Sequence, residues 1–406
     1  MNTFRFTLPN GLQAVQRQSL SEVVCCGLTI NAGTRDEAAA EHGVAHFTEH
    51  MLFKGTKKHS AYFINNRLES VGGELNAFTT KEETVIHATI MKNDVGKALE
   101  LLAEMAFNPT FPLKEIEKEK LIVFDEINAY KDNPSEQIFD DFEELLFGKA
   151  PIGRSILGSE RSLRTLTQKR IQQFTARYYR PQNAVLSMVG KFNPKQFEKL
   201  TEKYFGGFQA PPFVRQYTAP APYVPFHVTQ SRNTYQAHCI LGNRTYSLHH
   251  PKHVAMALFA NYLGGPASNS MLNTLLREKH GLAYTVEVNY NPYVDCGALT
   301  IYFGTDKEKI KKCCDLIFAA LEKLRKAPIE GRLLQRIKKQ FVGQLTIASD
   351  NTEAQMLSQA KNIITFNKIE TLEEINEKIY AVTPADMFNI AEESLNPDTL
   401  STLIYT

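Results

Sequence analysis

Hydrophobic and polar positions along this chain follow two periods, and their order predicts its elements. Alternation over residues 83–90 predicts a strand, and helical spacing over residues 94–107 predicts a helix after it. A second helical pattern opens at Pro112 and continues through Tyr130. We therefore expect a strand followed by two helices in the first half of the chain.

The second half repeats this order. A strand pattern passes through residues 302–304, a helical pattern covers residues 308–325, and a further helix opens at Pro328. At an offset of 218 residues, Asp132-Asn133 falls on Asp350-Asn351. This ordered self-similarity predicts a duplicated unit of strands and helices rather than a short-period repeat.

A segment rich in proline and alanine separates the two halves. Apolar periodicity is lost after Phe205, and the segment continues to Pro225. A chain of 406 residues also exceeds one ordinary core. We therefore predict an α+β protein of two duplicated domains, each an antiparallel-rich sheet covered by helices, joined by a linker as a clam-like pair. The expected boundaries are 1–208 for the first domain, 209–225 for the linker and 226–406 for the second domain.

Composition narrows the classes of function. A hydrophobic content of 43% and a charged content of 22% are those of a globular protein. The net charge of +2 gives no reason to expect a nucleic acid or an anionic membrane as partner. No apolar run approaches the ~20 residues that span a bilayer. The first residues show neither an apolar signal region nor an Arg-rich leader, so we expect a cytoplasmic protein.

The spacing of the cysteines indicates whether they form disulfides or bind metal. The six cysteines include the adjacent pairs Cys25-Cys26 and Cys313-Cys314 and no C-x-x-C spacing. This arrangement argues against a disulfide framework and against a thiolate zinc site. We expect small core residues in a reducing compartment.

The segment His46-Phe47-Thr48-Glu49-His50 carries the most specific chemistry. Its histidines are four residues apart and its glutamate follows the first by three, so all share one face of a helix. Two imidazoles can bind zinc there, and Glu49 can act as a base toward a zinc-bound water. The order H-x-x-E-H is that of the inverted zincins. Taken alone, the motif also fits three solvated polar side chains.

The duplicated copy provides an internal comparison. An offset of 210 residues aligns Val44-Ala45 with Val254-Ala255. The three polar motif positions then fall on Met256, Phe259 and Ala260. A polar cluster needed only for folding should persist in both copies, so its restriction to the first copy favours a function there.

A catalytic zinc needs a third protein ligand, and the helix after Pro112 offers carboxylates. Glu119 and Glu126 lie seven residues apart, two turns along a face that also carries Val123. In the second copy, Glu126 aligns with Gln344 at the offset of 218. From the helix alone, a solvated surface of glutamates and lysines is the simpler explanation.

Four segments together resemble the pitrilysin/insulinase family of metallopeptidases, most closely its processing-peptidase branch. Residues 43–56 resemble the family's metal-binding signature, with Thr48 where the family commonly has leucine. Residues 72–80 resemble its active-site edge strand, and the two glutamates of the predicted helix match its E-x6-E pair. Residues 277–284 resemble the segment that carries its Arg/Tyr pair. The similarity spans both halves of the chain.

The resemblance implies one zinc ion per chain. His46, His50 and Glu126 would be its ligands, a donor set that leaves the fourth position open for water. Glu49 would be the general base. Glu119 would orient a histidine or assist the base.

The resemblance also implies how substrate is held. Asn76, Ala77 and Phe78 would lie on an edge strand that pairs with an extended peptide through its backbone. Arg277 and Tyr284, from the second half, would grip substrate carbonyls and stabilise the developing oxyanion. Taken alone, Arg277 fits a solvated charge.

We therefore predict a zinc metalloendopeptidase that hydrolyses extended, unfolded or oligopeptide substrates. The alternative is a non-catalytic or partner-dependent scaffold subunit, because the family includes subunits without chemistry. The largest family members join four such domains in one polypeptide, and this chain resembles half of one. We therefore expect a homodimer, or a heterodimer with a related chain.

Overall fold

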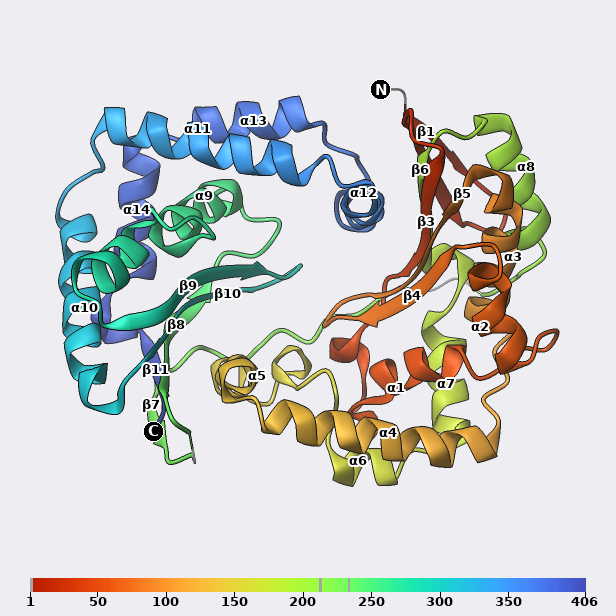
Figure 1. The fold of residues 1–406 in the computed structure, drawn as a ribbon, viewed down its shortest axis with the longest axis horizontal. Helices are drawn as coiled ribbons and strands as arrows, with labels where there is room; N and C mark the ends of the chain where they lie inside the picture. The colour runs from red at the N-terminus through yellow and green to blue at the C-terminus, as the bar shows by residue number, and fades with distance from the viewer. Residues whose placement is uncertain (1–2, 212–213, 233) are drawn as a thin grey trace. The chain divides into compact units, whose positions relative to one another are not determined.

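A computed structural model describes residues 3–211, 214–232 and 234–406, which form two compact units. Unit 1 comprises Met1–Asn128, Arg154–Tyr217 and Ile347–Ile369, and unit 2 comprises Ala129–Gly153, Thr218–Thr346 and Glu370–Thr406. Each unit holds a mixed sheet with helices packed on it (Figure 1). The predicted α+β class with two related domains is confirmed.

Unit 1 is built on a sheet that has six strands among the described residues, in the order β1-β2-β6-β3-β5-β4. Neighbouring strands pair antiparallel except β2 and β6, which are parallel. The edge strands are therefore β1 and β4. The strands are β1 (Thr3–Thr7), β2 (Gln13–Gln18), β3 (Val23–Ile30), β4 (Glu74–Thr79), β5 (Thr84–Met91) and β6 (Ala184–Gly190).

Helices cover both faces of this sheet. The main core lies under α1, α2, α3 and α8, and α12 packs on the strands β6 and β3 (Figure 1). The helices are α1 (Val44–Leu52), α2 (Ala61–Glu69), α3 (Val95–Phe107), α4 (Leu113–Lys131), α6 (Glu160–Arg164), α7 (Gln168–Tyr178), α8 (Pro194–Phe205) and α12 (Thr352–Phe366).

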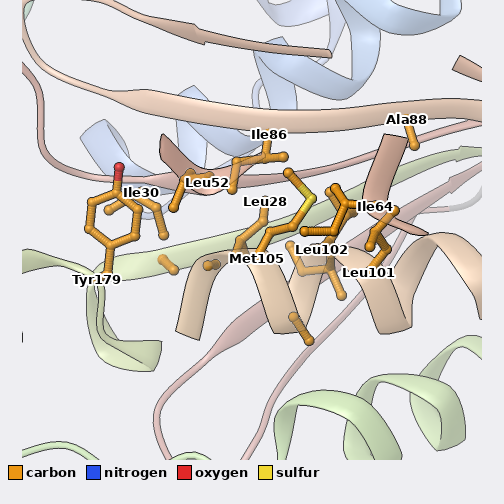
Figure 2. Packing of buried hydrophobic residues seen from close by; sticks show 14 of the residues in the cluster. Leu28, Ile30, Leu52, Ile64, Ile86, Ala88, Leu101, Leu102, Met105 and Tyr179 are labelled. Atoms are coloured by element: carbon orange, nitrogen blue, oxygen red, sulfur yellow. The ribbon is translucent and has the colours of Figure 1, made fainter. Parts of the chain in front are cut away.

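The sequence of β3 explains why both faces are covered. Successive side chains of a strand point to opposite faces, and all but the first residue of β3 are buried. Leu28 and Ile30 belong to the main core, whereas Cys25 belongs to the cluster around Met356 of α12. Figure 2 shows the main core, where sheet residues meet α3: Leu28, Ile30, Ile86, Ala88, Leu101, Leu102 and Met105, with Leu52, Ile64 and Tyr179 beside them.

Unit 2 repeats this plan on a sheet of five described strands, in the order β7-β11-β8-β10-β9. Again one pair is parallel, β11 with β7, and the others are antiparallel. The strands are β7 (His227–Gln230), β8 (Ala237–Thr245), β9 (Ala283–Pro292), β10 (Gly297–Thr305) and β11 (Ser401–Tyr405). The helices are α5 (Pro134–Phe147), α9 (His253–Gly264), α10 (Ile310–Lys326), α11 (Gly331–Ala348), α13 (Leu372–Ala381) and α14 (Pro384–Ser394).

The two faces of the second sheet are also filled by different clusters. Leu241 of β8 packs into the cluster formed with α9, α10 and α14, whereas Ile240 packs against Phe142 and Leu146 of α5. The helix α5 therefore covers one face of the second sheet, as α12 covers one face of the first.

These two covering helices are exchanged between the halves of the chain. The helix α5 comes from the first half and belongs to unit 2, and α12 comes from the second half and belongs to unit 1. The exchanged segments begin at Ala129 and Ile347, which are 218 residues apart, the offset at which the two halves align. The sequence predicted two contiguous domains, 1–208 and 226–406, without this exchange.

A small residue permits the close approach of each exchanged helix. A Cβ atom on Gly27 of β3 would lie 2.8 Å from the sulfur of Met356. A Cβ atom on Gly242 of β8 would lie 3.1 Å from the ring of Phe142. At Gly27, the Met356 and His87 side chains leave little room for a Cβ atom. At Gly242, a Cβ atom would also lie 2.2 Å from the Leu299 carbonyl oxygen of the neighbouring strand, so glycine is required there.

The strands and helices predicted from periodicity are confirmed. The strand expected at 83–90 is β5, the helices expected at 94–107 and from Pro112 are α3 and α4, and the second half supplies β10, α10 and α11. The predicted core role of cysteine holds for Cys25, Cys26, Cys239 and Cys313, whereas Cys296 and Cys314 are half-buried. In the described part of the chain, no helix has the length and apolarity that a membrane crossing requires.

The predicted linker is divided between the units. The unit boundary lies between Tyr217 and Thr218, and Arg215 is bound firmly to unit 1. Its guanidinium donates to Asp36 Oδ1 at 2.7 Å and to the Glu82 carbonyl at 3.1 Å. Two guanidinium groups, those of Arg35 and Arg215, lie 4.6 and 4.7 Å from the Tyr217 ring centre. Arg215 and Tyr217, which belong to the predicted linker, are thus anchored to unit 1.

Candidate metal centre

The helix α1 is positioned by a buried carboxylate at its N-terminus. Gly43 precedes the helix in the left-handed conformation, with φ 89°. Glu37 accepts hydrogen bonds from the backbone N–H groups of Gly43 and Ala45, at 2.9 and 2.8 Å. These N–H groups have no partner within the helix, and Glu37 supplies one. Glu37 was not anticipated, because a glutamate seven residues before the first residue of a helix has no recognised capping pattern.

The apolar face of α1 fixes the direction of its polar face. Val44, Phe47 and Met51 are completely buried in the main core. Because a helix turns every 3.6 residues, His46 and His50 then lie on the opposite side, with Glu49 beside them. The two imidazole rings contact each other at 4.6 Å between centres.

Glu126 of α4 completes a three-residue cluster with these histidines. Its carboxylate oxygens lie 3.6 Å from His46 Nε2 and 3.6 Å from His50 Nε2. One donor atom from each residue can be chosen so that all lie within 4.8 Å of one another. Three donors bound to a tetrahedral zinc at 2.0–2.2 Å lie about 3.4 Å apart, so this cluster fits zinc in chemistry and spacing.

A second carboxylate on α4, that of Glu119, contacts His50 at the ring nitrogen that faces away from Glu126. Glu119 Oε1 lies 2.9 Å from His50 Nδ1, which leaves Nε2 directed toward Glu126. Lys54 Nζ lies 2.7 Å from the other oxygen of Glu119. Such outer contacts fix the orientation of a metal-binding imidazole. Lys54 was not anticipated, because it lies beyond the end of α1 at Leu52 and no helical spacing connects it to His50.

Burial and neighbouring charge shift the pKa values in this cluster. Burial, assisted by the charge of His50, lowers the pKa of His46 to about 3, so this imidazole is neutral and able to bind a metal. Burial opposes the charged form of His50, but Glu119, Glu49 and Glu126 outweigh it and raise its pKa. Burial raises the pKa of Glu49, as expected for a carboxyl that is 8% exposed. Burial also disfavours the Glu119 carboxylate, but its bonds to His50 and Lys54 outweigh this effect and lower its pKa.

The strand β4 lies at the edge of the sheet, beside α1. Its residues Asn76, Ala77 and Phe78 pair with β5 on one side only. The predicted edge strand is therefore present. At its last position, the Thr79 hydroxyl donates a hydrogen bond of 2.7 Å to Glu49 Oε2.

Arg277 and Tyr284 lie in unit 2. Arg277 is on the helix Asn273–Lys279, and its half-exposed side chain lies 3.8 Å from Glu278 Oε1. Tyr284 is on β9, is 57% exposed and donates to Asp306 Oδ1 at 3.2 Å. Both line a pocket of about 390 Å³ with Gly264, Gly265 and Asn273. Their predicted action on substrate stays a prediction.

The second copy contains no comparable cluster among its described residues. On α9, which corresponds to α1, Met256, Phe259 and Ala260 are buried in an apolar core. The polar set of the first copy is thus replaced by packing residues, as its sequence indicated.

His46, His50 and Glu126 surround one point, and Glu49 lies beside the two histidines on α1. This arrangement is the type of site found in zinc peptidases. Residues 13–160 match the family model "Insulinase (Peptidase family M16)", and residues 165–341 match "Peptidase M16 inactive domain". The chain belongs to peptidase family M16, the insulinase family. The predicted family is confirmed by these matches.

Relatives match over almost the full chain. The uncharacterized zinc protease YmxG of Bacillus subtilis is 32% identical, over 98% of this chain and 97% of the relative. An uncharacterized zinc protease of Rickettsia bellii is 29% identical, over 94% and 92%. The fold matches a protease from Helicobacter pylori with a TM-score of 0.90 at 22% identity, covering 100% of this chain and 99% of that one. A crystal structure described as a peptidase M16 inactive domain from Pseudomonas fluorescens gives 0.91 at 20% identity, covering 100% and 98%.

Proposed function

We propose that this chain is a zinc-dependent endopeptidase that cleaves extended, unfolded or oligopeptide substrates. The observation that carries the proposal is the convergence of His46 and His50 Nε2 on the carboxylate of Glu126, with Glu49 on the same helix. Its membership of a peptidase family, and the names of its relatives, support the same class.

Each residue has a distinct task in this proposal. His46, His50 and Glu126 bind zinc, which when bound acidifies water and polarises a carbonyl. Glu49 accepts a proton from the attacking water and donates it to the leaving amine. Burial raises its pKa, which makes this carboxylate a stronger proton acceptor than a solvent-exposed glutamate.

Substrate is held along β4 in this proposal. The free edge of the strand offers backbone groups to an extended peptide, which allows varied side chains. Arg277 and Tyr284 contribute from unit 2 by stabilising carbonyl oxygens and the developing oxyanion. Substrates must therefore be unfolded locally, because a folded segment cannot add a strand.

The test combines a peptide library, mass spectrometry and elemental analysis of the purified full chain. We expect zinc in the protein, cleavage that a chelator removes, and a loss of at least about a hundredfold in rate for Glu49→Gln with zinc retained. The matched control is Glu117→Gln on α4, because its side chain is 73% exposed and pairs only with Lys120 among the described residues. Glu49→Gln with full activity would overturn the proposal. Zinc binding without any cleavage would instead support the scaffold alternative.

A further inference from the structure

The Glu49 carboxylate has a defined partner that no role described so far uses. Thr79 Oγ1 lies 2.7 Å from Glu49 Oε2, and the two residues are 9% and 8% exposed. Among the described residues, no other group forms a hydrogen bond with this carboxylate. One oxygen of Glu49 is therefore occupied by a hydroxyl donor, and the other is left for the reaction.

The hydroxyl itself is held rigidly. Threonine is branched at Cβ, so its χ1 angle is restricted and its hydroxyl has few alternative positions. Thr79 ends β4 and pairs with Thr84, the first residue of β5. The turn that follows is closed by Thr80 N–H donating to Glu83 O at 2.8 Å.

A second set of backbone bonds fixes this turn to the loop before α1. Thr34 N–H donates to Thr80 O at 3.1 Å, and Arg35 N–H donates to Lys81 O at 2.9 Å. The backbone that carries Thr79 is therefore restrained on both sides. A small shift of this backbone would move the hydroxyl away from Glu49.

We propose that Thr79 is a positioning residue that holds the general base in its reactive orientation. The inference rests on the proposed function and deepens it. The strand that would pair with the peptide ends in the residue that holds the base. A single strand thus sets both the register of the peptide and the direction of the carboxylate, which places the base at one fixed peptide bond.

The test compares three variants of the full chain with the wild type. Thr79→Val removes the hydroxyl while keeping the shape, and Thr79→Ser keeps the hydroxyl. Thr84→Val is the matched control, because it removes a buried hydroxyl next to Thr79 that donates to Ala32 O at 3.0 Å and does not contact Glu49. Measured quantities are kcat, KM, zinc content and melting temperature.

We expect Thr79→Val to lower kcat by about ten- to a hundredfold with KM within twofold and zinc unchanged, a loss in the range of a misplaced base. Thr79→Ser should restore kcat to within about threefold, and Thr84→Val should lower stability without this loss of kcat. Wild-type kcat in Thr79→Val would overturn the inference alone, as would equal losses of kcat in the two valine variants. A wild type that cleaves no peptide would overturn the proposed function, and this inference with it.

Discussion

At the scale of single residues, the site depends on polar groups that are buried and paired. The grouping of His46, Glu49 and His50 could be predicted from sequence because their spacing places them on one side of a single helix. The groups that hold them could not, because Lys54, Thr79 and Glu37 reach the site through side-chain contacts that no spacing encodes. Glu119 was anticipated through its resemblance to the family, not through the pattern of its helix.

Lys54 should affect zinc affinity although it touches no ligand. Lys54→Met leaves the Glu119 carboxylate, whose side chain is 5% exposed, without its cationic partner, so the hold on His50 weakens. We expect zinc affinity to fall about tenfold or more, measured by competition with a chromophoric chelator. The control is Lys58→Met, because Lys58 pairs with Glu104 and its side chain is 68% exposed. Equal affinities for both variants would contradict the role of Lys54.

Glu37 should make stability depend on pH. Burial raises its pKa to about 8, against the bonds from Ala45 and Gly43, whereas the unfolded value is 4.5. A carboxyl with a raised folded pKa contributes stability below pH 4.5 that is lost as the pH rises to 8. We expect the stability advantage of wild type over Glu37→Gln to shrink by about 3 kcal/mol between pH 5 and 8, measured by chemical denaturation. A difference that is independent of pH would show that Glu37 stays charged.

At the scale of elements, the periodicity of hydrophobic positions located the helices and strands. An element with one buried face must repeat apolar residues at its own structural period. The exchange of α5 and α12 escaped prediction for a physical reason. The amphipathic pattern of a helix indicates that one side of it packs on an apolar surface. The pattern does not indicate which sheet provides that surface. Cys25 of β3 and Ile240 of β8 needed a covering helix, and the sequence alone could not assign one to either.

Arg215 ties the predicted linker to unit 1. Arg215 binds Asp36, and the two side chains are 6% and 3% exposed. Arg215→Met would leave a buried carboxylate without its cation, and we expect it to lower the free energy of unfolding by about 3–5 kcal/mol. Arg164→Met breaks an exposed pair with Glu160 and should cost at most about 1 kcal/mol. Equal effects in denaturant titrations would mean that the linker anchor does not stabilise unit 1.

At the scale of the whole molecule, the two halves are similar in plan and unequal in chemistry. The duplication, and the absence of the polar motif from its second copy, could be predicted from the sequence offsets, whereas the division of the chain into units could not. Assembly with a second copy or a related chain stays a prediction. Analytical ultracentrifugation of the active protein tests it, and a fully active monomer would refute it.

Unit 1 should not fold from the first half alone. A fragment of residues 1–217 lacks α12 and exposes the apolar face that includes Val15, Val185 and Val189. We expect this fragment to bind a hydrophobic dye and to aggregate, because an exposed apolar sheet face is unstable in water. Joining residues 347–369 to it through a flexible linker should restore a cooperative unfolding transition. A fragment that folds cooperatively without this addition would contradict the assignment of α12 to unit 1.

The reciprocal exchange of α5 and α12 also bears on how such a chain can change over generations. In the second copy, Met256, Phe259 and Ala260 of α9 are packed in an apolar core at the positions of the polar motif. Deletion of that copy would remove the helix that shields the first sheet, so a frameshift there would disable the remaining half as well. We therefore expect the second copy to be needed for the folding of unit 1, whether or not it takes part in the reaction.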